Sequence, residues 1–140
     1  MRISAKRRGL SDAWVVNSSP IISLAKIGRL DLLETACPGF EIPYEVAVEI
    51  VGGPPSDPAR RILESGWGRV VESPPTPSIV LDWELGAGES AVLAHALIHQ
   101  STAVLDDGAA RKCARSLGVS LTGTVGVILR TNRDSVAVAR

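Results

Sequence analysis

Residues 15–22 read VVNSSPII, and this stretch predicts a strand that passes directly into a helix. The two valines end a short apolar segment that begins at Ala13, as expected for a buried strand. One of the two serines can cap the helix, and Pro20 suits its first turn, where the missing N–H costs nothing. The helix should end near Gly28, because glycine is frequent just beyond helix C-termini.

The same alternation of strand and helix continues along the chain. Predicted strands also cover residues 40–42, 69–72, 102–107 and 119–124. Predicted helices cover residues 29–36, 43–51, 59–65, 88–100, 108–118 and 125–133, and turn-rich breaks lie at 52–58 and 73–77. Short strands that are apolar on both faces and alternate with helices are typical of a parallel sheet covered by helices. The sequence therefore predicts an α/β fold with a mainly parallel sheet of about four or five strands.

Length and composition favour a single small domain without a membrane segment. The chain has 140 residues, and its 15 basic and 15 acidic residues cancel, so no global field indicates a nucleic-acid or membrane partner. No apolar run approaches the ~20 residues that span a bilayer, and no signal peptide is recognised. We predict a cytoplasmic protein with a basic arm at residues 1–12, a domain at 13–133 and a tail at 134–140. Cys37 and Cys113 form no CxxC pair and are expected to be buried thiols.

Polar residues fall where the predicted strands end. Asn17 ends the first strand, and Asp106 and Asp107 end the strand that begins at 102. Glu89 lies in the first turn of the preceding helix, and Glu49 lies late in the helix at 43–51. Ligands of open α/β sheets bind outside the carboxyl ends of the strands, and clustered carboxylates favour Mg²⁺ or Mn²⁺. Such a site could hydrolyse a phosphodiester by activating water.

Each of these residues also has a purely structural interpretation. Glu89 can simply interact with the dipole of its helix, and Asn17 can form a turn. One of Asp106 and Asp107 is expected to cap the following helix and leave the other free. Glu49 can face solvent, because its apolar neighbours do not decide which side of the helix it occupies.

Four segments, in this order and spacing, resemble the PIN-domain family over roughly residues 14–130. They are VVNSSPIISLAKIGRLDLL (15–33), IPYEVAVEIV (42–51), GAGESAVLAHAL (86–97) and AVLDDGAARKCARSLGVSLTGTVGVIL (103–129). The resemblance implies a three-layer α/β/α fold. It also implies an Mg²⁺- or Mn²⁺-dependent ribonuclease, a group of family members that includes the toxin halves of toxin–antitoxin pairs. An antitoxin protein is then an expected partner in addition to RNA.

The resemblance also assigns site residues. Glu49 and Glu89 match the second family acid and the acid of the mid-chain helix, and Asp107 matches the late acid, with Asp106 as its competitor. Ser19 and Thr124 match hydroxyl residues that accompany the acids. The metal is expected between Glu49, Glu89 and Asp107.

The first family acid, however, falls on Asn17. An amide oxygen can ligate a metal or orient a water, but it brings no charge and cannot act as a base. We therefore expect weaker metal binding and slow or absent cleavage. The alternatives are a catalytically impaired module that binds RNA or protein, and an interaction protein whose main unit is a homodimer.

Three further groups of residues have the chemistry of a binding site. His95 and His99 have the spacing of a zinc pair, but no third ligand stands nearby in the sequence, and a catalytic zinc site needs three. Arg111 and Lys112 follow the acidic pair, where RNA would pass, and are candidates for phosphate contact. The basic residues at 6–8 are expected to form a solvated tail.

Overall fold

The computed structural model describes residues 13–139, with side chains described as far as 132. Five strands are present, β1 (Trp14–Val16), β2 (Glu41–Pro43), β3 (Arg69–Val71), β4 (Thr102–Val104) and β5 (Leu121–Thr122). The helices are α1 (Ser18–Lys26), α2 (Asp31–Ala36), α3 (Tyr44–Val51), α4 (Pro58–Glu64), α5 (Ser78–Leu81), α6 (Ala87–His99), α7 (Gly108–Ser116) and α8 (Thr124–Ala139). The predicted arm at residues 1–12 lies outside the described residues.

The five strands form one sheet in the order β3-β2-β1-β4-β5, and every neighbouring pair is parallel. The predicted α/β class and parallel sheet are therefore confirmed. The chain first moves from β1 outward to β3 and then returns to place β4 on the other side of β1. In an open sheet of this kind, the crevice beyond the carboxyl ends of the two strands that flank this reversal, here β1 and β4, is where ligands bind.

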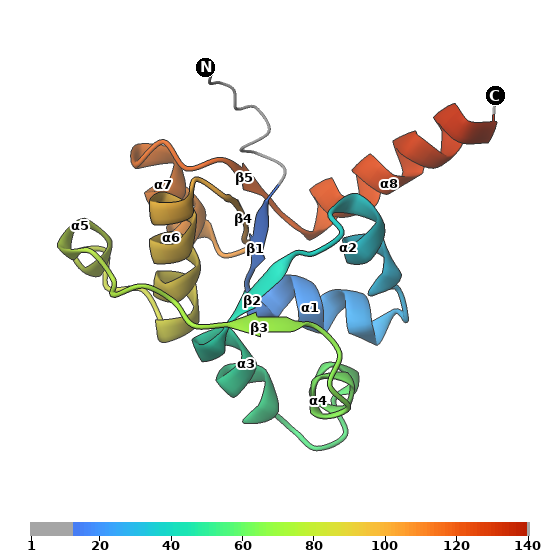
Figure 1. The fold of residues 1–140 in the computed structure, drawn as a ribbon, viewed down its shortest axis with the longest axis horizontal. Coiled ribbons are helices and arrows are strands. Elements are labelled where there is room, and N and C mark those ends of the chain that lie inside the picture. Colours follow the sequence, from blue (N-terminus) through green and yellow to red (C-terminus); the bar gives the residue numbers. More distant parts are fainter. Residues whose placement is uncertain (1–12, 140) are drawn as a thin grey trace.

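Helices cover both faces of the sheet, as Figure 1 shows. The blue helix α1 and the cyan helix α2 lie on one side of the strands, and α6 and α7 lie on the other. The strands pass between these layers, and all of β1 and β4 is buried. Aliphatic side chains of the sheet, among them Val15, Val16, Ile42 and Val104, are completely buried with Leu24 of α1. These burials explain why the strands are apolar on both faces.

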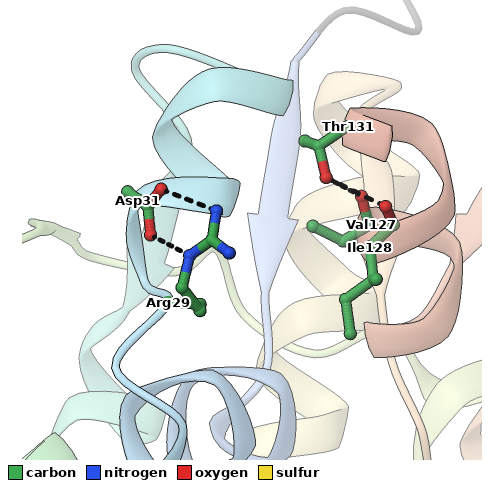
Figure 2. Close-up of polar contacts among 5 residues, drawn as sticks. All are labelled: Arg29, Asp31, Val127, Ile128 and Thr131. Carbon is green, nitrogen blue, oxygen red and sulfur yellow. Dashed lines mark hydrogen bonds and ion pairs between the residues drawn. The ribbon is translucent and has the colours of Figure 1, made fainter. Parts of the chain in front are cut away.

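Polar contacts at the start of α2 and within α8 are drawn in Figure 2. Arg29 donates from two guanidinium nitrogens to the carboxylate of Asp31, at 3.0 and 3.2 Å, which braces the turn between α1 and α2. The buried hydroxyl of Thr131 donates to the carbonyls of Val127 and Ile128. It is therefore satisfied within α8, which packs against α2.

Two elements differ from the sequence-based expectation. The four residues of α5 form a helix where none was predicted. Helix α8 continues to Ala139, past residue 133, through most of the segment predicted as a tail. Within the described residues, no helix is long and apolar enough to cross a membrane.

Candidate metal and nucleic-acid site

Asn17 and the acidic pair lie at the same edge of the sheet. Val16 of β1 is paired with Val104 of β4, and the Asn17 N–H donates to the Val104 carbonyl at 3.1 Å. Asn17 directly follows β1, and Asp106 stands two positions beyond Val104. The crevice beyond β1 and β4 is therefore bordered by both segments that the sequence singled out.

The side chain of Asn17 does not behave like that of a simple turn residue. Asn17 occupies the N-cap position of α1, but its side chain makes no capping hydrogen bond. The residue is 1 % exposed, and its Oδ1 is buried without a hydrogen-bond partner. An unpaired buried acceptor costs about 1–3 kcal/mol, so some other group is needed to satisfy it. A bound cation or an ordered water would do so.

Glu49 points to the same place from α3. That helix buries Val46 and Ile50 against the core, and this orientation leaves Glu49 on an exposed position. A Cβ built on Gly88 would lie 2.7 Å from Glu49 Oε1 and 3.3 Å from Asn17 Oδ1. Both oxygens therefore lie against the first turn of α6, on the side of Gly88. Glu49 is exposed, as the solvent-facing interpretation expected, but its carboxylate lies against the same glycine as the buried amide oxygen of Asn17.

Glu89 is half-buried on the first turn of α6 and bends back toward the start of its own helix. Its Oε1 would lie 2.7 Å from a Cβ built on Gly86, the N-cap residue. This position lets the carboxylate interact with the positive end of the helix dipole, as the structural interpretation expected. Glu89 thus belongs to the same helical turn as Gly88, but its carboxylate lies against Gly86, whereas the oxygens of Asn17 and Glu49 lie against Gly88.

The two aspartates after β4 have different roles. Asp107 caps α7, and its Oδ2 accepts a hydrogen bond from the Ala110 N–H at 3.0 Å. Asp106 uses both of its oxygens on Thr124, with the N–H at 2.8 Å and the hydroxyl at 2.6 Å. One of the pair caps α7, as expected, but Asp106 is engaged as well. Among the described residues, Asp107 Oδ1 accepts no hydrogen bond, whereas each oxygen of Asp106 accepts one, so Asp107 Oδ1 is the less engaged ligand atom of the pair.

The candidate phosphate-binding residues border the same edge. Arg111 is half-buried, and its Nη1 donates to the Leu105 carbonyl at 2.8 Å, which holds the guanidinium beside Asp106 and Gly123. Together with Thr122, Arg111 and Asp106 line a shallow pocket at the start of α8. Lys112 and Ser19 are both exposed.

The arrangement has the donors of a weakly charged cation site. In the described part of the chain, no three His, Cys, Asp or Glu side chains gather closely enough to hold a metal ion. The group at Gly88 instead combines one orphaned amide oxygen with one carboxylate, and Glu89 lies on the same turn. Mg²⁺ commonly keeps several waters and uses only one or two carboxylates. These oxygen donors fit such an ion, with less charge than three acids would provide.

The histidines lie elsewhere. His95 is buried, and its Nε2 lies 2.9 Å from Glu41 Oε1, whose carboxylate also contacts Arg69 at 3.4 Å. The ring of His99 is 4.5 Å from that of His95. Glu41 begins β2, so this cluster lies toward the amino ends of the strands, away from the edge that carries Asn17 and Asp106. The contact with Glu41 was not foreseen, because the two residues are far apart in sequence.

Sequence reasoning also missed Gly86 and Gly88. Their spacing directly before Glu89, in the segment GAGE, is the only sequence feature that could have indicated them. Without side chains, the two glycines leave room for carboxylates at the start of α6.

Comparisons with known proteins agree with this architecture. The chain is similar in structure to PAE2754 from Pyrobaculum aerophilum, with a TM-score of 0.61 and 15% sequence identity over 84% of this chain and 88% of that one. At this identity the likeness supports the fold alone. A comparison with curated proteins gives no match. The family model DUF3368, described as a PIN domain, matches residues 13–138, which is nearly the whole described chain. The protein therefore belongs to the PIN-domain family.

Proposed function

We propose that this chain is a divalent-metal-dependent endoribonuclease whose site is one charge short. Membership of the PIN-domain family supports a nuclease role and nucleic-acid binding in general, and PIN domains generally use divalent metal ions. The observation that carries the proposal for this chain is that Asn17 Oδ1 and Glu49 Oε1 both lie against Gly88. A buried acceptor without a partner beside a carboxylate is what a bound cation would satisfy.

Four residues would hold Mg²⁺ or Mn²⁺ in this proposal. Asn17 and Glu49 would hold the ion at Gly88. Glu89 and Asp107 do not gather with Glu49 in the described structure, so they would have to move toward a bound ion, Asp107 with its Oδ1 because its Oδ2 caps α7. The ion, when bound, would lower the pKa of a coordinated water and stabilise the leaving oxygen. Because Asn17 cannot accept a proton, deprotonation of the water falls to a carboxylate, and the exposed Glu49 is the accessible one.

The remaining residues would bind the RNA. Arg111 is fixed by its bond to the Leu105 carbonyl and can offer its other guanidinium N–H groups to a phosphate. Lys112 follows it on α7 with an exposed ammonium group, and Ser19 is exposed at the start of α1. Thr124 acts indirectly, because its N–H and hydroxyl are both bonded to Asp106.

Cleavage of a labelled single-stranded RNA tests this function. The natural protein should cleave slowly with Mn²⁺ and not at all in EDTA. Glu49→Gln should abolish the cleavage. Glu34→Gln removes an exposed acid of α2 that lies away from the edge, and it should leave the rate unchanged. Cleavage that survives EDTA, or that Glu49→Gln leaves intact, would overturn the proposal.

A second function is favoured by the same asparagine. Asn17 stands where the family has a carboxylate, and both oxygens of Asp106 already accept hydrogen bonds from Thr124. Because fewer acidic groups are then available for hydrolysis, the alternative is a module that binds RNA or protein without cleaving RNA. RNA binding that is unaffected by EDTA, together with no cleavage, would select this alternative.

The proposed partners follow from the surface and from the family. Val125 and Leu129 lie four residues apart on α8 and are 68 % and 55 % exposed. These side chains support a homodimer, which light scattering at micromolar concentration would test. A role as the toxin of a toxin–antitoxin pair requires a neighbouring gene for a small antitoxin, and co-purification of the two products would test that role.

A further inference from the structure

The first turn of α6 contains two glycines that the backbone does not require. Gly86 is the N-cap residue with φ −65° and ψ 166°, which any residue can adopt. Gly88 lies inside the helix and is not among the glycines with positive φ. Glycine is less favourable than alanine at a helical position. Glycine suits the N-cap position of Gly86 better than alanine does, but the presence of Gly88 needs an explanation other than backbone geometry.

Carboxylates occupy the space that side chains at these positions would fill. A Cβ at Gly88 would stand 2.7 Å from Glu49 Oε1, and a Cβ at Gly86 would stand 2.7 Å from Glu89 Oε1. Both separations are well below ordinary van der Waals contact. Between the glycines, Ala87 carries a side chain and is exposed. The two positions without a Cβ are thus the two against which the carboxylates lie.

We propose that the segment Gly86-Ala87-Gly88 is the positioning element of the site, an inference that rests on the proposed function. Gly88 lets Glu49 approach the helix from α3 and lets the amide of Asn17 approach it from the end of β1. Gly86 lets the side chain of Glu89 fold back onto the first turn of its own helix. The glycines act through these side chains and touch no substrate. The absent Cβ of Gly88 leaves room for the oxygens of Glu49 and Asn17, and the absent Cβ of Gly86 leaves room for Glu89.

The geometry separates this role from a general structural one. In both cases the atom nearest to a new Cβ is the end of a flexible glutamate side chain, and at Gly88 the buried Asn17 Oδ1 follows at 3.3 Å. Alanine would therefore move the carboxylate and leave the backbone in place. Because alanine also favours the helix, Gly88→Ala should keep or raise thermal stability while it weakens cation binding.

The test is calorimetric titration of Mn²⁺ into the full chain and three glycine variants, with a melting curve of each. Gly88→Ala should raise the Mn²⁺ dissociation constant by about tenfold or more, as expected when a carboxylate leaves contact distance. Gly86→Ala should raise it less, because it displaces Glu89 alone. Gly108→Ala is the matched control, since it also lies in a first helical turn and its Cβ would meet nothing within 4 Å.

The possible outcomes distinguish the positioning role of the glycines from the proposed metal-dependent ribonuclease function. If the natural protein binds Mn²⁺ and Gly88→Ala binds it equally well, the positioning role is wrong and the proposed function stands. A Gly88→Ala protein that no longer folds also overturns the inference, because the side chain of Glu49 then cannot move aside to make room for the new Cβ. If the natural protein binds no Mn²⁺ at millimolar concentration, the proposed function fails, and the positioning role fails with it.

Discussion

Replacing Asn17 by aspartate restores the missing charge at nearly constant shape. The new carboxylate would be almost completely buried, and its oxygen would lie beside Glu49 Oε1, because both atoms stand within 3.3 Å of a Cβ position at Gly88. Two like charges roughly 4–6 Å apart repel by about 1–4 kcal/mol at effective dielectrics between water and a protein surface. Without metal, Asn17→Asp should therefore lower the free energy of unfolding by an amount in this range.

A divalent cation reverses the sign of this effect. The same charge then attracts the ion, so the Mn²⁺ affinity of Asn17→Asp should rise about tenfold or more, and a tenfold rise corresponds to about 1.4 kcal/mol. RNA cleavage should rise with it, and adding Glu89→Gln should remove the gain. In melting experiments, Mn²⁺ should stabilise Asn17→Asp more strongly than it stabilises the natural protein.

Calorimetric titration of Mn²⁺ measures the affinity, and the chain provides a matched control. Asn132→Asp makes the same chemical change at an exposed position of α8, so it alters the net charge but not the site. Its Mn²⁺ affinity should equal that of the natural protein. If Asn17→Asp gains no more than Asn132→Asp, Asn17 is not at a metal site. Brisk cleavage by the natural protein would show instead that the amide is an adequate ligand.

Three further predictions concern stability. Asp107→Ala removes the N-cap bond to Ala110 and should cost about 1 kcal/mol, measured by urea unfolding; an unchanged midpoint would contradict the capping role. Thr124→Val removes the hydroxyl bond to Asp106 but keeps the N–H bond, and it should cost about 1 kcal/mol in the same assay, whereas no loss would show that this bond contributes nothing. Burial raises the pKa of the Cys113 thiol, so the folded chain holds its proton to higher pH than the unfolded chain does. Stability should therefore fall as the pH rises above about 9, and Cys113→Ala should flatten this fall; an equal fall in the variant would refute the assignment.

The fold could be predicted because its determinants are local. Short β-branched strands such as the one ending at Val16 need two covered faces, and alternation with helices makes the sheet parallel. The segments that follow β1 and β4 then meet at one edge, which placed Asn17 near the acidic pair. The helix α5 was missed because four residues after a proline-rich break carry too little periodicity to indicate a helix.

The site was less predictable because its geometry depends on side chains from distant elements. The neighbours of Glu49 did not decide its direction, and only the packing of α3 against α6 directs its carboxylate to Gly88. Likewise, the sequence could not tell that Thr124 engages both oxygens of Asp106, since the two lie 18 residues apart.

Anomalous diffraction from crystals of the natural protein grown with Mn²⁺ tests the central claim most directly. The claim is that a cation satisfies the buried oxygen of Asn17 together with the carboxylates of Glu49 and Glu89. The account predicts one manganese peak in contact with Asn17 Oδ1 and Glu49, at the start of α6. No peak there at millimolar Mn²⁺, or a peak only at another place such as the His95 cluster, would contradict it.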